Sequence, residues 1–276
     1  MPKPTDNLAE RDWAHWTEPA FVDIEGVNTA YRRKGSGEPL LFLHGAGMTR
    51  TWLPLFEELS KSFDVIVPEH PGYGDTELPS WVENMDDFVL HYDALLRELD
   101  IENPHLVGHS LGGWMAANQA IFYPTRFRSL TLLAPMGLMV PEAPLADPFR
   151  LSPQTGLEML FSGVGEHYLE YLQQGDPVEN QLHSYEESIT LALLAWNPRY
   201  DYRLNHRLGR VHIPATVVAF ADDRFVPRRH AELYAEYLPQ GHLEILEGVR
   251  GEPASHVAIV QQPVELAALI AKATHR

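Results

Sequence analysis

Residues 104–122 read PHLVGHSLGGWMAANQAIF, and this stretch decides the fold. Residues 104–107 are typical of a short buried strand, and residues 111–122 are typical of a helix rich in Ala and Met. Between them, residues 108–112 form the pattern G-x-S-x-G, which predicts a sharp turn that exposes Ser110 at the C-terminal edge of a sheet. Glycine two positions to either side avoids a side-chain clash in so tight a turn. Ser110 is therefore a candidate nucleophile, and a solvated serine in a Gly-rich turn is the alternative.

A nucleophilic serine needs a base, and the base needs a group that orients it. In the chain order that this turn implies, the acid follows the serine and the histidine follows the acid. Residues 215–221 read ATVVAFA and predict a strand that ends at Asp222 and Asp223. Successive side chains diverge, so both carboxylates cannot face one imidazole. We expect one to orient the base and the other to close the turn into a helix whose first residue is Pro227.

Position along the chain selects the base. The histidines that follow the two aspartates are His230, His242, His256 and His275. His230 falls in the helix just begun, His275 in the C-terminal tail, and His242 before the last predicted strand, at the opposite edge of the sheet. His256 follows that strand and the loop 248–255, so it arrives at the same edge as Ser110. His256 is therefore the candidate general base, against a lone surface histidine as the alternative.

Small residues after an earlier strand predict an oxyanion hole. Residues 40–43 are apolar throughout and are followed by His44-Gly45-Ala46-Gly47. Small side chains let backbone N–H groups face a cavity and stabilise a tetrahedral intermediate. We expect the Leu111 N–H to be one donor and the Ala46 N–H the other, with Gly45 as the alternative for the second. His44 is expected to brace the loop.

Together these segments resemble the α/β-hydrolase fold superfamily. The matching segments, in the family's order, are residues 44–47, 71–75, 108–113 and 223–227, and His256 with Pro263. The family's acid usually stands four residues before the proline of a D-x-x-V-P segment, and this resemblance selects Asp223 over Asp222. Two positions depart from the family: Ser255 stands where glycine is common, and Gln261 where glutamate is common.

The rest of the chain agrees with an α/β fold in which helices cover a mostly parallel sheet of about eight strands. Residues 21–25 and 28–33 predict a hairpin about Gly26, and Asn84 predicts the start of a helix. Further strands are expected at residues 40–44, 64–68, 105–108, 129–134, 216–221 and 243–246. We divide the chain into a first core part, 1–134, which includes an N-terminal extension at 1–20, a helical cap at 135–208, and a second core part at 209–276.

The segment 135–208 predicts three or four short helices broken by Pro and Gly, and the resemblance implies that they form a cap over the active site. The candidate pocket residues are Trp114, Met136, Tyr168, Tyr171 and Trp196, of which Trp114 fits the core better than the pocket. Because these candidate pocket residues are apolar or aromatic, they indicate a small, hydrophobic substrate.

Composition excludes several functional classes. The chain has 276 residues and no cysteine, which excludes disulfides, thiolate catalysis and Cys-based zinc sites, and we expect no metal or other cofactor. A net charge of −17 argues against nucleic acid and anionic membranes as partners. The first thirty residues contain no secretory h-region, and no run of eighteen apolar residues occurs. We expect a cytoplasmic protein that acts on a small-molecule ester, with a homodimer left open.

Three functions fit these features. Hydrolysis of carboxylic esters or lactones ranks first, because it needs only the triad, the oxyanion hole and water. The resemblance also allows carbon–carbon hydrolysis of vinylogous diketones, but that branch usually has tryptophan after the histidine, where this chain has Val257. Epoxide and haloalkane hydrolysis in the family use an aspartate nucleophile, which Ser110 argues against. A ligand receptor with a retained triad ranks last.

Overall fold

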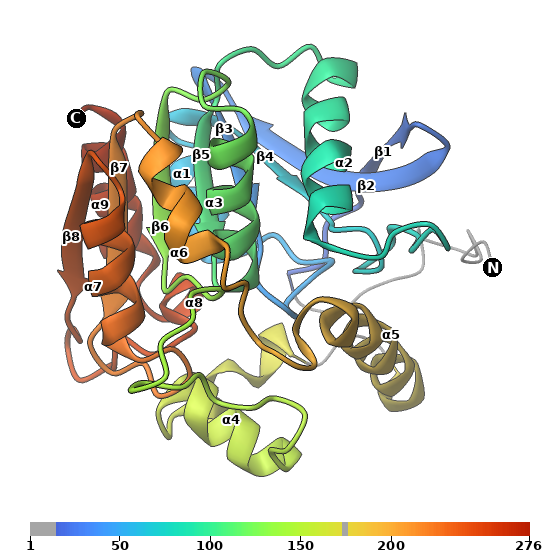
Figure 1. Ribbon diagram of the computed structural model, residues 1–276. Helices are drawn as coiled ribbons and strands as arrows, with labels where there is room; N and C mark the ends of the chain where they lie inside the picture. Colours follow the sequence, from blue (N-terminus) through green and yellow to red (C-terminus); the bar gives the residue numbers. More distant parts are fainter. Residues whose placement is uncertain (1–14, 173–175) are drawn as a thin grey trace.

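The computed structural model of the protein describes residues 15–172 and 176–276, and Figure 1 shows a single sheet flanked by helices. The eight strands lie in the order β1-β2-β4-β3-β5-β6-β7-β8. Their bounds are Ala20–Ile24 (β1), Val27–Gly35 (β2), Glu38–Leu43 (β3), Phe63–Pro68 (β4), His105–His109 (β5), Ser129–Leu133 (β6), Ala215–Phe220 (β7) and Gly241–Leu246 (β8). The predicted fold class is confirmed.

The sheet begins as an antiparallel hairpin and continues as a parallel sheet. β2 pairs antiparallel with both β1 and β4, whereas all the pairs from β4 to β8 are parallel. The hairpin turns at Gly26, as predicted, with a φ of +87° that favours glycine. Because parallel strands end at the same edge, the loops after β3, β5, β6, β7 and β8 meet there.

Helices cover both faces of the sheet, so its central strands are apolar on both sides. In β7, Val217 and Ala219 pack into one core, whereas Val218 and Phe220 pack into the other. On the first face lie α2 (Met85–Glu98), α3 (Leu111–Phe122) and α7 (Arg228–Tyr237). On the second face lie α1 (Pro54–Leu59), α8 (Ala258–Gln261) and α9 (Pro263–Thr274).

Two predicted helix starts can be compared with the structure. α2 begins after Asn84, whose side chain accepts a hydrogen bond from the Asp86 N–H while Asp87 accepts one from the Asn84 N–H. This reciprocal capping fixes the helix start where the sequence predicts it. α7 begins at Arg228, so Pro227 caps the helix and the predicted start was one residue early.

Between β6 and β7 the chain leaves the sheet and forms α4 (Pro153–Phe161), a 3₁₀ helix (Gly165–Tyr171), α5 (Pro177–Ala195) and α6 (Leu204–Arg207). Figure 1 shows α4 and α5 apart from the layers that cover the sheet. At 19 residues, α5 is longer than the predicted short helices, and Pro177 does not break it but stands in its first turn after the Asp176 cap. The domain limits at 135 and 208 remain a prediction, and residues 1–14 of the N-terminal extension lie outside the described residues.

A buried carboxylate holds α5 on the core. Glu187 accepts hydrogen bonds from the Thr49 hydroxyl (2.5 Å) and the Gly74 N–H (3.1 Å), and its Oε1 lies 3.8 Å from Nη1 of Arg50. Burial raises the pKa of Glu187, and the Arg50 charge opposes that shift. This anchor fixes the helical turn that also carries Leu191.

Candidate active site

Ser110 lies on a strained turn between β5 and α3. Its φ of +54° and ψ of −114° are rare for a residue with a side chain. A Cβ at Gly108 would lie 2.3 Å from the Gly112 carbonyl oxygen, and one at Gly112 would lie 2.1 Å from the Leu43 carbonyl oxygen. Both glycines are therefore needed for the close approach of strand and helix. The predicted turn is present, and the serine hydroxyl lies at the carboxyl edge of the sheet.

Ser110, His256 and Asp223 form a continuous hydrogen-bonded chain. The Ser110 Oγ lies 2.9 Å from Nε2 of His256, and Nδ1 of His256 lies 2.8 Å from Oδ2 of Asp223. The His256 and Asp223 side chains are 4% and 1% exposed, so water barely reaches this pair. With Nδ1–H donating to the carboxylate, Nε2 is the free acceptor for the serine proton.

The two adjacent aspartates have different partners. The second carboxylate oxygen of Asp223 accepts hydrogen bonds from the N–H groups of Phe225 (2.7 Å) and Val226 (2.8 Å), which fix its direction. Asp222 instead accepts from the Ala254 N–H (3.0 Å) and so ties the end of β7 to the loop before His256. The structure thus brings Asp223, and not Asp222, to the imidazole.

The two departures from the family pattern contact each other. The Ser255 hydroxyl donates to Oε1 of Gln261 at 2.7 Å, and the Ser255 N–H donates to the same oxygen at 3.2 Å. This pair holds the residue before His256 by two hydrogen bonds to one side-chain oxygen. No single-residue pattern in the sequence pointed to this pairing.

His109 is a site residue that the sequence reasoning missed. Its Nε2 donates to the His256 carbonyl oxygen at 2.8 Å, so its Nδ1 carries no hydrogen. That Nδ1 is buried and has no hydrogen-bond partner among the described residues. Burial lowers the pKa of His109 to about 3, so the ring stays neutral and positions the His256 backbone. A variable position inside G-x-S-x-G gave no signal of this role.

A cavity of about 310 Å³ opens at Ser110. Its lining residues are Gly45, Ala46, His109, Ser110, Met136, Pro148, Leu151, Ser152, Pro153, Gly156, Leu160, Leu191, Phe225 and His256. Gly45 adjoins the nucleophile, because a Cβ there would lie 3.3 Å from the Ser110 Cβ. Leu111 is the first residue of α3, directly after Ser110. The proposed oxyanion donors thus adjoin the serine, and their role remains a prediction.

Of the five candidate pocket residues, only Met136 is part of this lining. Trp114 is buried in the core against Gly137. Tyr168 stacks on Phe161, and its hydroxyl donates to Glu252 at 2.9 Å. The remaining two also lie outside: Tyr171 stacks on His15, and Trp196 is 61% exposed and packs on Phe149. Aliphatic residues from α4 and α5 take the place expected for the aromatics.

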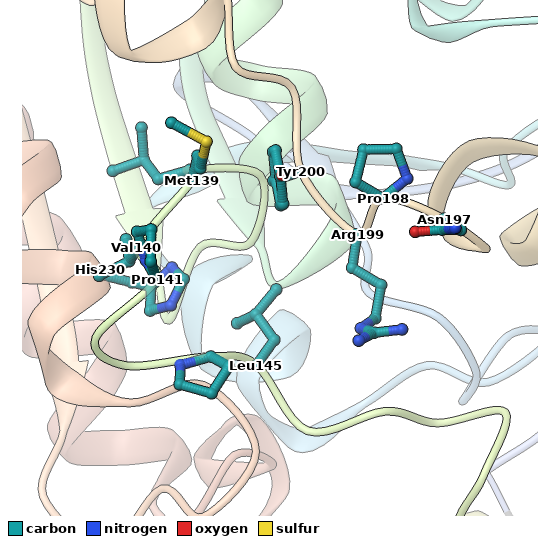
Figure 2. Close-up of a pocket in the computed structure, with 11 residues that line it drawn as sticks. Met139, Val140, Pro141, Leu145, Asn197, Pro198, Arg199, Tyr200 and His230 are labelled. Carbon is teal, nitrogen blue, oxygen red and sulfur yellow. The ribbon is translucent and has the colours of Figure 1, made fainter.

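A second cavity, of about 220 Å³, lies between residues 138–145 and 197–200 (Figure 2). In Figure 2, Val140 and Pro141 lie on the left, Pro198 and Asn197 on the right, and Tyr200 between them. It shares no lining residue with the cavity at Ser110. Among residues 15–172 and 176–276 there is no group of three potential metal ligands and no helix long and apolar enough to cross a membrane.

Six buried histidines predict a loss of stability in mild acid, and burial lowers the pKa of two of them, His105 and His230, below the ordinary value. Burial lowers the pKa of His44 and His91 to about 4, that of His109 to about 3, and that of His70 well below its ordinary value. In the unfolded chain each ring takes up a proton below about pH 6.5. The unfolded state therefore binds more protons as pH falls from there toward 4, and the free energy of unfolding decreases. Each ring contributes roughly 1 kcal/mol per pH unit.

Denaturant titrations at about pH 7.5, 6 and 5 measure this effect. His91 lies on α2 with its Nε2 3.3 Å from the Thr29 hydroxyl, and His91→Gln should reduce the pH slope by the share of one of these rings. His206→Gln serves as the control, because this side chain is exposed in the folded protein. A free energy of unfolding that does not change from pH 7.5 to 5 would contradict the prediction.

Comparison with family models matches residues 40–269 to the "Alpha/beta hydrolase family". The matched range contains Ser110, Asp223 and His256. Among solved structures, a "meta-Cleavage product hydrolase from Pseudomonas fluorescens IP01" superposes with a TM-score of 0.75 at 20% identity, over 93% of this chain and 97% of that one. At that identity the likeness concerns the fold alone.

Two curated relatives are hydrolases with named substrates. The chain is 38% identical over 121 residues to 2-hydroxymuconate semialdehyde hydrolase of Pseudomonas sp. (strain CF600), over 42% of this chain and 43% of that protein. It is 28% identical over 251 residues to 2-hydroxy-6-oxo-6-phenylhexa-2,4-dienoate hydrolase of Comamonas testosteroni, over 81% and 84%. The chain spans only 36 to 43% of the length of three relatives that it matches at 32 to 38% identity.

Proposed function

Because this chain belongs to the alpha/beta hydrolase family, we propose that it is a serine hydrolase that cleaves a small, hydrophobic carbonyl compound through an acyl-enzyme on Ser110. The observation that carries this proposal is the chain of hydrogen bonds from Ser110 through His256 to Asp223. A structural role alone does not account for a serine in a strained conformation whose side chain lines a cavity.

The geometry leads to a two-step reaction. The Ser110 Oγ attacks the substrate carbonyl carbon while Nε2 of His256 takes the hydroxyl proton, and the Asp223 carboxylate stabilises the imidazolium. His256 then gives that proton to the leaving group, and the bond to the carbonyl carbon breaks. Water attacks the acyl-enzyme with the same proton transfers, which releases a carboxylic acid and restores Ser110.

The negative charge on the tetrahedral intermediate needs hydrogen-bond donors. Ala46 lines the cavity beside Ser110, and Leu111 opens α3 at the same point. We assign the Leu111 N–H as the first donor and the Ala46 N–H as the second. Backbone donors fixed in place stabilise the developing charge without rearrangement.

The named relatives favour carbon–carbon hydrolysis of vinylogous diketones as the first candidate reaction. Two curated relatives are hydrolases of a 2-hydroxymuconate semialdehyde and of a 2-hydroxy-6-oxo-6-phenylhexa-2,4-dienoate. In this reaction the leaving group is carbon: it departs as the enolate of the substrate's 2-oxo tautomer and takes the proton from His256.

The lining of the cavity favours ester or lactone hydrolysis as the second candidate. No lysine or arginine belongs to the lining that the described residues form at Ser110. A dienoate would bury its carboxylate there without a cation to pair with, which is costly, whereas a neutral ester or lactone needs no such partner. Val257, where the carbon–carbon branch usually has tryptophan, agrees with this second candidate.

Turnover assays on the purified protein separate these candidates. We would test 2-hydroxy-6-oxo-6-phenylhexa-2,4-dienoate, p-nitrophenyl butyrate and a small lactone, each with the wild type and with Ser110→Ala. We expect turnover of one class in the wild type and its loss in the variant. If no class is turned over, the protein is better explained as a ligand receptor with a retained triad.

Leu191 is expected to limit the length of the substrate. It lies on the buried side of α5 and lines the cavity at Ser110. Leu191→Ala lengthens the cavity, so the ratio of kcat/KM for p-nitrophenyl octanoate to that for the acetate should rise by about tenfold. The pH dependence should stay unchanged, since Leu191 transfers no proton.

Leu193→Ala is the matched control, because this leucine lies on the outer side of the same helix with 42% of its surface exposed. It should leave the chain-length ratio unchanged. An equal change in both leucine variants would mean that the helix as a whole, and not the cavity wall, sets selectivity.

A further inference from the structure

The outer face of α5 carries a row of exposed apolar side chains. Val178, Leu182, Tyr185, Ile189 and Trp196 are between 47% and 68% exposed. At 100° per residue, they lie opposite the face that carries Glu187, Thr190 and Leu191. Figure 1 shows α5 at the margin of the molecule. We call these five residues, together with the partly exposed Ala192, the outer stripe.

The spacing of the outer stripe is that of a helix–helix seam. Its members follow one another at intervals of four, three, four, three and four residues, which is the heptad pattern of two packed helices. A helix that lies flat on a lipid surface presents a wider apolar arc and a polar face rich in Lys and Arg. α5 contains neither Lys nor Arg.

We propose that the outer stripe pairs with the outer stripe of a second copy of this chain, with the two α5 helices antiparallel about a twofold axis at the level of Glu187. This register pairs Val178 with Trp196, Leu182 with Ala192, and Tyr185 with Ile189. In the first two pairs a large side chain faces a smaller one, so the stripe is complementary to itself, as a twofold interface requires.

The size of the stripe is sufficient for such an interface. Its two aromatic and three large aliphatic side chains, each about half exposed, offer on the order of 500 Å² per copy. Two copies then bury about 1,000 Å², which reaches the lower range for a specific interface. The net charge of −17 and the acidic Glu179 and Glu186 on α5 disfavour an anionic membrane as the occupant.

Pairing would also act on the cavity at Ser110. The buried face of α5 carries Leu191 over that cavity and Glu187 in the anchor to the core. A second copy packed on the outer face would therefore restrain α5, and with it the position of Leu191 in the cavity wall. Glu186 flanks the outer stripe close to the twofold axis, so in the dimer it faces Glu186 of the second copy. Added salt screens these two negative charges and should therefore strengthen the association.

Light scattering coupled to gel filtration measures the mass directly. We expect wild type at micromolar concentration to have about twice the 31.2 kDa of one chain, and Ile189→Glu to have the mass of one chain. Leu90→Glu is the matched control, because Leu90 has a similar exposure (57%, against 47% for Ile189) but lies on α2. It should keep the wild-type mass. Ser110→Ala should do so as well, so this test is independent of the proposed function.

Two outcomes overturn the proposal. One is a wild-type chain that stays monomeric up to about 100 μM, well above the micromolar concentration at which we expect the dimer. The other is a monomer that floats with phosphatidylcholine vesicles and loses this property in Ile189→Glu, which assigns the stripe to lipid.

Cysteine cross-linking tests the register, and the chain has no native cysteine to interfere. Antiparallel pairing predicts that Leu182→Cys and Ala192→Cys chains form a disulfide when mixed. Neither alone should, because like positions lie about 15 Å apart along the axis. Cross-links between chains of the same variant, and none between the two variants, would show parallel helices and contradict the antiparallel register.

Discussion

Replacing Ser110 with alanine is expected to lower kcat by a factor on the order of 10⁴ to 10⁶ while the protein stays folded. The hydroxyl oxygen is the atom that bonds to the substrate carbonyl, and among residues 15–172 and 176–276 the other serine in the cavity lining is Ser152, at the start of α4. Circular dichroism and single-turnover kinetics on the same samples separate a loss of chemistry from a loss of structure. Ser129→Ala is the control, because Ser129 is equally buried but bonds His105 on the sheet.

A glycine at the same position gives a second readout. Ser110 has a φ of +54°, which glycine adopts without strain, so Ser110→Gly should raise the free energy of unfolding by about 1 kcal/mol while it abolishes turnover. A gain in stability together with a loss of turnover would show that the backbone strain at Ser110 serves catalysis. Near-normal turnover in either variant would show that Ser110 is not the nucleophile.

The two neighbouring aspartates should differ by orders of magnitude in their effect. Asp223→Asn should lower kcat by about 10⁴, because an amide in this place can donate a hydrogen to Nδ1 and so stabilise the wrong tautomer of His256. Asp222→Asn should cost less than about tenfold, since its partner is the Ala254 N–H and asparagine keeps an oxygen that can accept that bond.

Steady-state kinetics with the better substrate, at one pH near 8, compares the two variants. The reverse order of effects would mean that Asp222 orients the base in solution. Equal losses would mean that both carboxylates support the imidazole, which the distance of 2.8 Å from Asp223 to His256 argues against.

The sequence was sufficient for the fold and for the residues that meet at the candidate site, although local chemistry alone specifies only the turn at Ser110. The apolar run before Ser110 and the glycines around it specify a strand, a turn and a helix without help from distant residues. His256 followed from topology, since parallel strands bring their ends to one edge. Even the choice between the two aspartates agreed with the hydrogen bonds of the structure, although it came from the family resemblance and not from physics.

The helical segment between β6 and β7 was harder to predict, because its residues fold against partners far away in the sequence. An aromatic residue such as Tyr168 or Trp196 indicates burial somewhere, but the direction of its side chain depends on how α4 and α5 dock. That docking rests on Glu187, a charged residue that patterns of hydrophobicity place at the surface. The pairing of Ser255 with Gln261 was equally hidden, because each residue alone reads as a departure from the family.

An acyl-enzyme on Ser110 is tested most directly by covalent labelling and peptide mass spectrometry. The wild-type protein is treated with a fluorophosphonate and digested, and the modified residue is located by fragmentation. We predict one adduct, on Ser110, that forms much more slowly in His256→Ala because the base is missing. Labelling on another residue, or a Ser110 that stays unmodified while substrate is turned over, would contradict a Ser110 acyl-enzyme.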